Sequence, residues 1–299
     1  MNINCSQTDS QIFPFSSEEN YRAGFVAIVG RPNAGKSTLI NSLVGEKIAI
    51  TANQPETTRK VIRGIVSHEN GQLVLVDTPG LHRPRTLLGQ RLNDLVSDAL
   101  SDVDAVVICF PADEKIGPGD RYLLEKVMLT RAAVFAVITK SDKISREALA
   151  AKLLAVSQLA DFTQIVPVCA VTGEQIELLS GLLTAQMPLS PPLYPKSAVT
   201  DESDEERMAE LIREAALEGV REELPHSIAV VIEDVGERVR QRGDKRPPIV
   251  DVRASVYVER DSQKGIVIGK GGQRMKAVGA RARHGIEELL GKKFFLIFG

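Results

Sequence analysis

The chain has 299 residues, of which 43% are hydrophobic and 25% are charged, and its formal net charge is −2 at pH 7. This is ordinary globular material of about two domains. No apolar run approaches the roughly 18 residues of a transmembrane helix, and the polar N-terminus lacks a signal-peptide pattern. Three scattered cysteines are too few for a disulfide framework or a metal site. We therefore expect a cytosolic protein with reduced cysteines.

Residues 1–20 are expected to form a loosely ordered extension. From 21 to 187, strand-length apolar runs alternate with helical periodicity, which predicts an α/β domain with a doubly wound, mostly parallel sheet. The Asn70-Gly71 pair favours a tight hairpin, so the second and third strands should be antiparallel. Strands are expected at Phe25–Val29, Val61–Ser67, Leu73–Val76, Ala105–Phe110, Val134–Ile138 and Ile165–Val168, and helices at Gly89–Leu100, Asp120–Leu129, Arg146–Leu159 and Glu174–Gln186.

A phosphate-binding loop is predicted between the first strand and the helical segment that follows it. The pattern G-x-x-x-x-G-K-[ST] is matched by Gly30, Arg31, Pro32, Asn33, Ala34, Gly35, Lys36, Ser37 and Thr38. Glycines let backbone N–H groups turn toward a phosphate, and the helix N-terminus adds partial positive charge. Lys36 would reach the β- and γ-phosphates, and the Ser37 hydroxyl would bind Mg²⁺. The alternative, a glycine-rich turn before a helix, does not account for the flanking strand.

Two later segments match what a nucleotide hydrolase needs. The first follows a predicted strand and consists of Asp77-Thr78-Pro79-Gly80. Here Asp77 can hold a Mg²⁺-bound water, and the Gly80 N–H can donate to the γ-phosphate. The second follows another predicted strand and consists of Thr139-Lys140-Ser141-Asp142. The Asp142 carboxylate can accept hydrogen bonds from the N1–H and N2–H₂ groups of guanine. The alternative for Asp142 is a helix N-terminal acid. After the next strand, beyond Cys169, the Ala170 N–H could reach the guanine O6.

A proline-rich segment, 188–200, is predicted to link this domain to a second one at 201–299. The second domain begins with a helix at Asp204–Glu222, followed by strands at Ser227–Asp234 and Val250–Val258. From Glu237 onward, fifteen lysines and arginines outnumber seven aspartates and glutamates. Such a basic region is often only a solvated face, but around a glycine loop it is typical of nucleic-acid binding.

That glycine loop follows an apolar turn and precedes a basic helix, which predicts an α+β KH domain. Its G-x-x-G pattern is formed by Gly269, Lys270, Gly271 and Gly272. Small residues let the backbone approach the sugar–phosphate chain of RNA. Lys270, Arg274 and Lys276 would supply charge, and Ile266 and Ile268 would line the groove under the bases.

Together these segments resemble the translation-factor-like P-loop GTPases and, within them, the Era family, over about 21–299. The resemblance makes Gly30–Ser37 the first GTPase motif, Asp77–Gly80 the third, Thr139–Asp142 the fourth and Cys169–Ala170 the fifth. It places the switch region at Glu56–Arg59 and implies that Thr58 completes the Mg²⁺ shell, with Thr57 as the open alternative.

The family pattern implies a GTP-hydrolysing, RNA-binding switch that assists assembly of the small (30S) ribosomal subunit. It would act as a monomer that binds GTP or GDP and 16S ribosomal RNA near its 3′ end. Family members also associate with the inner membrane surface, for which this chain offers only its basic face. A passive RNA-binding adaptor is the main alternative. A P-loop kinase acting on a small molecule is disfavoured by the base-reading Asp142.

Two positions, Thr139 and Cys169, depart from the family pattern. Thr139 replaces an asparagine, which we expect to lower affinity by about 1 kcal/mol, the worth of one hydrogen bond. Cys169 replaces a serine and is a weaker donor. Leu81 stands where a glutamine could orient the attacking water. In related GTPases an asparagine at the position of Asn33 helps to bind K⁺, which could stabilise the transition state; a loop-stabilising amide is the alternative.

The chain stops shortly after a predicted last strand of the KH sheet, Phe294–Phe298, which is apolar at five consecutive positions. The resemblance implies a polar tail beyond this strand, so the domain reads as C-terminally short. Because a strand that is apolar on both sides needs cover on both faces, we expect exposed apolar surface here.

Overall fold

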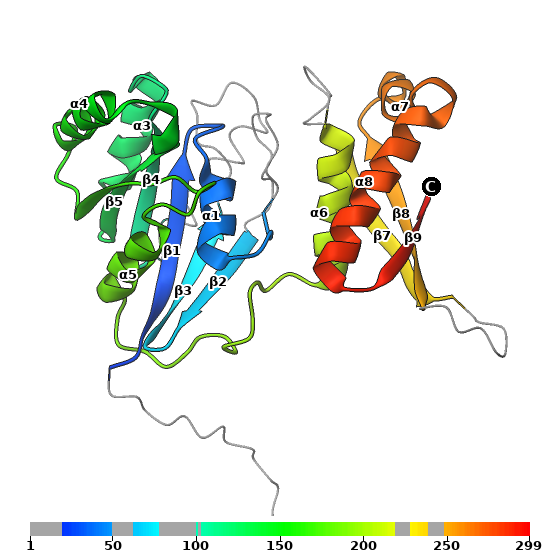
Figure 1. Cartoon of the computed structure of the whole chain (residues 1–299), viewed down its shortest axis with the longest axis horizontal. Coiled ribbons are helices and arrows are strands. Elements are labelled where there is room, and N and C mark those ends of the chain that lie inside the picture. The colour runs from blue at the N-terminus through cyan, green and yellow to red at the C-terminus, as the bar shows by residue number, and fades with distance from the viewer. Residues whose placement is uncertain (1–19, 50–61, 78–99, 101–102, 219–227, 239–247) are drawn as a thin grey trace, which may run out of the picture.

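The computed structural model describes residues 20–49, 62–77, 100, 103–218, 228–238 and 248–299. Among these residues, six strands form one sheet in the order β2-β3-β1-β4-β5-β6, with helices on both faces (Figure 1). Only β2 runs antiparallel, against β3, so the doubly wound sheet and its hairpin are confirmed. The elements of this domain are β1 (Arg22–Gly30), α1 (Lys36–Val44), β2 (Ile62–His68), β3 (Gly71–Asp77), β4 (Ala105–Pro111), α3 (Pro118–Val127), β5 (Ala133–Thr139), α4 (Arg146–Ser157), β6 (Gln164–Pro167) and α5 (Ile176–Gln186).

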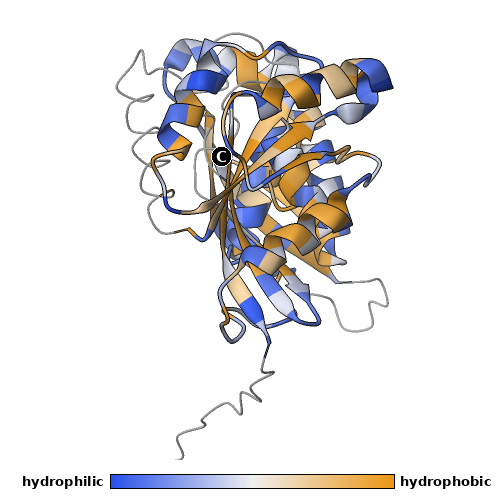
Figure 2. Ribbon diagram, turned by 90° about the vertical axis from the view of Figure 1, so that its left-hand side faces the viewer, coloured by the Kyte–Doolittle hydropathy of each residue, from blue (hydrophilic) through white to orange (hydrophobic). Residues whose placement is uncertain are grey.

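The sheet separates two hydrophobic cores. In β1, Val26 and Ile28 pack into the core that includes residues of α1 and α5. Ala27 and Val29 pack into the core that includes residues of α3 and α4. Strands β3 and β4 are buried along their whole length, as expected where helices cover both faces. Figure 2 shows hydrophobic residues concentrated in the strands of the central sheet. The predicted helix Gly89–Leu100 and the 1–20 extension fall almost entirely outside the described residues.

The segment 188–200 is fixed to the sheet of the first domain. The side chain of Gln72 in β3 is fully buried. Its Oε1 accepts hydrogen bonds from the backbone N–H groups of Leu193 and Tyr194, and its Nε2 donates to Tyr194 O. Further along, Ile65 N of β2 donates to Val199 O at 2.9 Å. The chain therefore leaves the first domain along β2.

The second domain packs helices on one face of a sheet ordered β7-β8-β9 among the described residues. Ser203 and Glu206 form a capping box that starts its first helix. The segment before the glycine loop is a helix rather than the apolar turn that we predicted, because Gln263 reaches back to Arg260 N and starts a helical turn. None of the described helices is both long and apolar enough to span a bilayer. The elements are α6 (Asp204–Leu217), β7 (Ile228–Glu237), β8 (Ile249–Val258), α7 (Asp261–Ile268), α8 (Gln273–Leu290) and β9 (Lys293–Phe298).

The last strand, β9, exposes apolar side chains, as predicted. Phe294 packs into the core, whereas Phe295 and Ile297 on the opposite face are 46% and 38% exposed. Tyr257 of the neighbouring strand β8 is also 54% exposed, beyond the stretch of β8 that pairs with β9. The outer face of this sheet therefore carries an apolar patch.

We expect this patch to make the second domain associate more readily than the first. An isolated 201–299 fragment should self-associate, because burying the exposed half of one such side chain between copies gains about 1 kcal/mol. In the dilute, monomeric state it should melt below a 21–187 fragment, because part of its apolar surface stays in water. Replacing Phe295 and Ile297 by threonine keeps strand propensity and should weaken the association. Sedimentation and thermal unfolding of the fragments measure both effects. A 201–299 fragment that stays monomeric and melts above the other would contradict the expectation.

Candidate nucleotide and RNA sites

The predicted phosphate loop lies between β1 and α1. Gly35 is the N-cap of α1 with φ 86°, a left-handed conformation that glycine adopts without strain. Asn33 is also left-handed, with φ 62°, and its side chain is exposed. Asparagine tolerates this conformation better than most residues, so backbone geometry alone gives one reason for its presence.

Lys36 lies inside the loop. Its side chain is 7% exposed, and Nζ donates hydrogen bonds to the carbonyl oxygens of Gly30 and Arg31 at 3.3 and 3.2 Å. Burial lowers the pKa of the Lys36 ammonium, while the nearby Asp77 carboxylate acts in the opposite direction. Nucleotide phosphates would add negative charge here and so favour the charged ammonium.

Ser37 and Asp77 form the metal side of the site. Asp77 ends β3 and is fully buried, and its Oδ2 accepts a hydrogen bond from Ser37 Oγ at 3.1 Å. A hydroxyl and a carboxylate oxygen are hard ligands that suit Mg²⁺, which keeps several waters and binds substrate phosphates. The described residues hold no group of three His, Cys, Asp or Glu side chains that would form an all-protein metal site. The other two predicted residues, Thr58 and Gly80, lie outside the described residues.

The predicted base-reading segment is tied directly to the phosphate loop. Thr139 at the end of β5 is buried, and its Oγ1 donates to Ala34 O at 2.7 Å. Lys140 follows in a left-handed conformation with φ 56°. The hydroxyl of threonine therefore bridges the two loops where the family pattern has an asparagine.

Sequence reasoning missed the partner of Asp142. The thiol of Cys169, which ends the stretch after β6, donates to Asp142 Oδ1 at 3.1 Å. The sequence placed Cys169 in the fifth motif as a weaker donor than serine but did not identify its partner, and the structure shows it as a free, buried cysteine. Its place in the fifth motif was the signal for this second role. The other buried cysteine, Cys109, has its thiol pKa raised to about 12 by burial.

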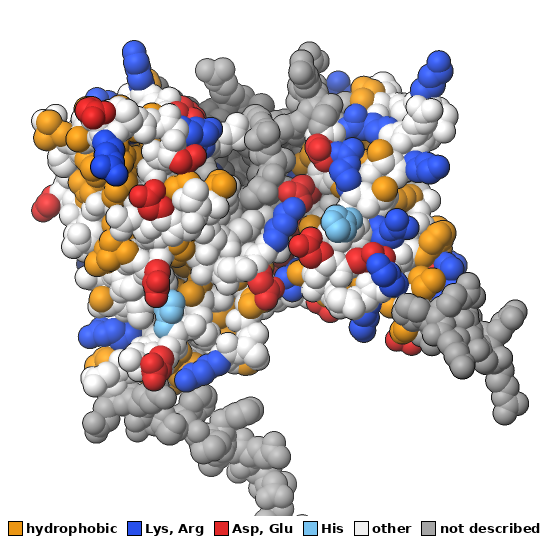
Figure 3. Space-filling view, viewed as in Figure 1, with side chains coloured by type: hydrophobic (Ala, Val, Ile, Leu, Met, Phe, Trp, Pro, Cys, Tyr) orange, Lys and Arg blue, Asp and Glu red, His pale blue; other side chains and the backbone are white. Residues whose placement is uncertain are grey.

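The G-x-x-G loop joins α7 to α8. Gly269 has φ 74°, and a Cβ there would lie 2.6 Å from Arg274 Cβ, so this position requires glycine. Lys270 and Lys276 are exposed, and Ile268 is 47% exposed beside them. Figure 3 shows Lys and Arg side chains gathered over this part of the second domain.

Arg274 differs from its predicted role as a charge supplied to RNA. Its guanidinium donates to the carbonyl oxygens of Ala216 and Glu218 at 3.1 Å each, at the C-terminal end of α6. Carbonyls at a helix end lack partners within the helix, so a cation there satisfies them. In this structure Arg274 therefore fastens the loop to α6.

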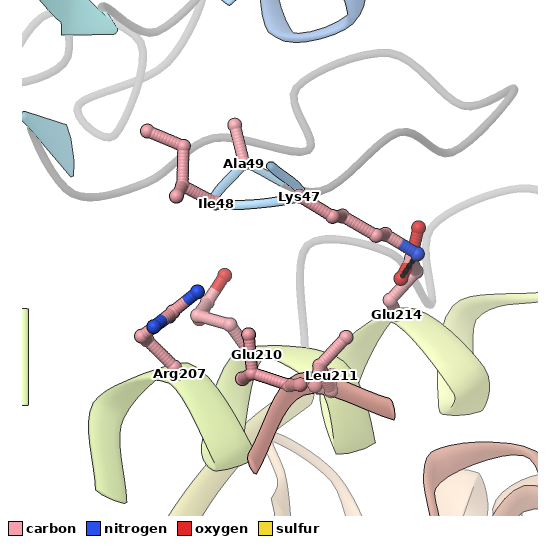
Figure 4. Close-up of a pocket in the computed structure, with 8 residues that line it drawn as sticks. Lys47, Ile48, Ala49, Arg207, Glu210, Leu211 and Glu214 are labelled. Atoms are coloured by element: carbon pink, nitrogen blue, oxygen red, sulfur yellow. Dashed lines mark ion pairs between the residues drawn. The ribbon is translucent and has the colours of Figure 1, made fainter. Parts of the chain in front are cut away.

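The two domains touch beside α1. Lys47 forms an ion pair with Glu214 of α6 at 2.6 Å, and Arg207 of α6 pairs with Glu46 at 3.4 Å. Figure 4 shows Lys47 and Glu214 meeting across a narrow crevice that Leu211 also lines. The Asn41 side chain of α1 holds this segment, because its Oδ1 accepts from Ile48 N and Ala49 N.

This fold and these sites define a P-loop GTPase joined to a KH domain. A 50S ribosome-binding GTPase family matches residues 25–140, and a KH domain family matches 223–298. GTPase Era of Mycolicibacterium smegmatis is 57% identical over 279 residues, covering 92% of each chain. GTPase Era of Mycobacterium tuberculosis is 55% identical over 280 residues, with the same coverage. The chain therefore belongs to the Era family of GTPases.

Two solved structures have the same overall fold. A crystal structure of Era in complex with MgGDPNP and nucleotides 1506–1542 of 16S ribosomal RNA has a TM-score of 0.84 and 33% identity, covering 93% of this chain and 92% of that one. Era of Aquifex aeolicus bound to GDP and AlF₄⁻ has a TM-score of 0.85 and 32% identity with the same coverage.

Proposed function

We propose that this protein hydrolyses GTP with Mg²⁺ and binds 16S ribosomal RNA near its 3′ end, and that it thereby assists assembly of the 30S ribosomal subunit. Two hydrogen bonds carry the nucleotide assignment, because they bring the predicted motifs together. Thr139 donates to the phosphate loop, and the Cys169 thiol donates to Asp142. The Era structures bound to a Mg²⁺-nucleotide and to RNA support both activities.

In this proposal Lys36 holds the β- and γ-phosphates, and the N–H groups of the phosphate loop surround them. Ser37, Asp77 and Thr58 are the residues that would hold Mg²⁺. A bound Mg²⁺ would neutralise phosphate charge as the terminal bond breaks. Gly80 would donate its N–H to the γ-phosphate, and Asp142 would read guanine. RNA would lie against the G-x-x-G loop.

GTP turnover and RNA binding by the whole protein test this function. We expect hydrolysis of GTP but not ATP, and binding to an RNA with the sequence of nucleotides 1506–1542. RNA binding without turnover would support the passive adaptor instead. Transfer of phosphate to a small molecule would support the kinase.

We expect potassium to accelerate hydrolysis more than sodium does, because Leu81 cannot orient water and Asn33 can offer an amide oxygen to an ion. Asn33→Gly keeps the left-handed backbone but removes the amide, so it should abolish the difference between the two salts. Leu81→Ala should change turnover by less than about tenfold, because no aliphatic side chain positions water. Rates measured in matched K⁺ and Na⁺ buffers decide this, and equal rates would contradict it.

We further propose that GTP favours one placement of the two domains and that hydrolysis relaxes it. The ion pairs of Lys47 and Arg207 with their partners support this coupling, because Asn41 connects that segment to the helix of the phosphate loop. The protein would act as a monomer, and any membrane attachment would be peripheral, through the basic face.

Reversing one interdomain charge should shift this placement. Lys47→Glu puts like charges together, and since a partly exposed pair contributes about 0.2–1 kcal/mol, we expect up to about a fivefold shift in the domain equilibrium. Adding Glu214→Lys should restore it. Energy transfer between dyes on the two domains measures the shift, with Lys126→Glu as a control remote from the contact. An energy-transfer efficiency that is the same in all variants would contradict the proposed coupling between nucleotide state and domain placement.

A further inference from the structure

One side chain of the phosphate loop points away from the nucleotide site. Arg31 Nε donates to Asp120 Oδ1 at 2.7 Å, and its terminal nitrogen donates to Glu114 Oε2 at 3.0 Å. Asp120 lies near the start of α3, and its side chain is only 2% exposed. Its other oxygen accepts from Gly117 N at 2.7 Å, so both oxygens are held. A planar guanidinium against a fixed carboxylate restricts the arginine closely.

The backbone of the same arginine belongs to the nucleotide site. Arg31 O accepts hydrogen bonds from Lys36 Nζ and from Ala34 N, both at 3.2 Å. The position of Arg31 therefore sets where the loop carbonyl and the lysine ammonium lie. Gly119 leaves room for this arrangement, because a Cβ there would lie 3.0 Å from Arg31 Cδ.

The segment that carries Glu114 also faces the base-reading motif. Lys140 Nζ lies 3.8 Å from both Asp113 Oδ1 and Glu114 Oε1, and Lys143 Nζ lies 3.3 Å from Asp113 Oδ2. Glu114 thus contacts a side chain from each of the two nucleotide-binding segments. Pairs as exposed as these contribute little alone. The buried Asp120 is the member of the group that can fix the loop.

We propose that Asp120 is a positioning residue for the nucleotide site: by holding Arg31, it keeps the phosphate loop in its binding conformation before a nucleotide arrives. This rests on the proposed function, because it takes Gly30–Ser37 as the phosphate site. A preformed loop spares the cost of ordering on binding. Since Lys36 would reach the β-phosphate, GDP benefits more than GMP, which ends at the α-phosphate.

The test compares the affinities of GMP and GDP for the whole protein. The variant Arg31→Met with Asp120→Asn removes both charges together, so no unpaired charge stays buried. We expect the ratio of the GMP to the GDP dissociation constant to fall about tenfold. A change of this size corresponds to the loss of roughly one charge-assisted hydrogen bond. Lys143→Gln, which breaks only the exposed pair with Asp113, is the control and should leave the ratio unchanged.

Arg31→Lys is the second variant, because it keeps the charge against Asp120 but loses the planar fork. It should also lower the ratio of the GMP to the GDP dissociation constant, by about threefold. An unchanged ratio in a folded variant, with equal losses for GMP and GDP, would overturn the proposal, since the pair would then only support the fold. Wild-type protein that binds GMP as tightly as GDP would instead count against the phosphate-site assignment itself.

Discussion

Replacing Asp142 by asparagine should lower the affinity for GTP by at least about 100-fold. In the proposed pocket the carboxylate accepts two hydrogen bonds from guanine, and each bond to a charged acceptor contributes about 1.5–3 kcal/mol. The amide of asparagine offers one acceptor and one donor, so one guanine donor would face a donor. Titration of a fluorescent GDP analogue, with GTP as competitor, measures the loss.

The same variant should bind xanthosine triphosphate better than the wild type does, because the amide can donate to the 2-oxo group and accept from N1–H. Asp161→Asn, an exposed acid between α4 and β6, removes the same charge away from the site and serves as the control. GTP affinity that is unchanged by Asp142→Asn would remove this residue from the pocket.

Cys169 allows a finer test of the same pocket. Its thiol donates to Asp142, so Cys169→Ser keeps a donor and should preserve affinity, while Cys169→Ala should weaken GTP binding by less than tenfold. An alanine variant that binds GTP as the wild type does would show that the thiol does not orient the carboxylate.

The strands of the first domain and the order of the motifs could be predicted from the sequence. Buried parallel strands are continuous apolar runs, so β4 and β5 stand out, and Asp77 directly follows such a run. Asn70-Gly71 specifies a hairpin by its local backbone preference. These features depend on residues that are close in sequence, and for this reason the sequence alone predicts them.

Contacts between distant side chains could not be predicted. The fifth motif brings Cys169 to the base pocket but does not say that its thiol meets Asp142, and Arg31 lies 89 positions from Asp120. Arg274 was predicted to face RNA because of its charge, yet charge alone does not say whether a cation meets a phosphate or a helix C-terminus. Which partner a charged side chain meets depends on how the helices and strands pack against one another, and the periodicity of the sequence does not encode this packing.

Replacing both Lys270 and Gly271 by aspartate should lower RNA affinity by at least an order of magnitude. The change removes one cation and adds two anions where the backbone would meet phosphates, and such contacts dominate affinity for nucleic acids. The fold should survive, because nothing lies within 4 Å of a Cβ at Gly271, whose φ of 60° aspartate tolerates. Gly269 is unsuitable for this test, since its Cβ would strike Arg274.

The other end of α8 provides a matched control. Gly291 has φ 63° with nothing within 4 Å of a Cβ, and the exposed Lys292 follows it. Two aspartates there repeat the charge change about 27 Å away along the helix, at a rise of about 1.5 Å per residue. Binding to the RNA of nucleotides 1506–1542 should fall only for the loop variant, while GTP turnover without RNA stays within a few-fold in both. Equal losses in the two variants would mean that net charge, rather than the G-x-x-G loop, determines RNA affinity, because long-range attraction does not distinguish the two ends of the helix at low salt.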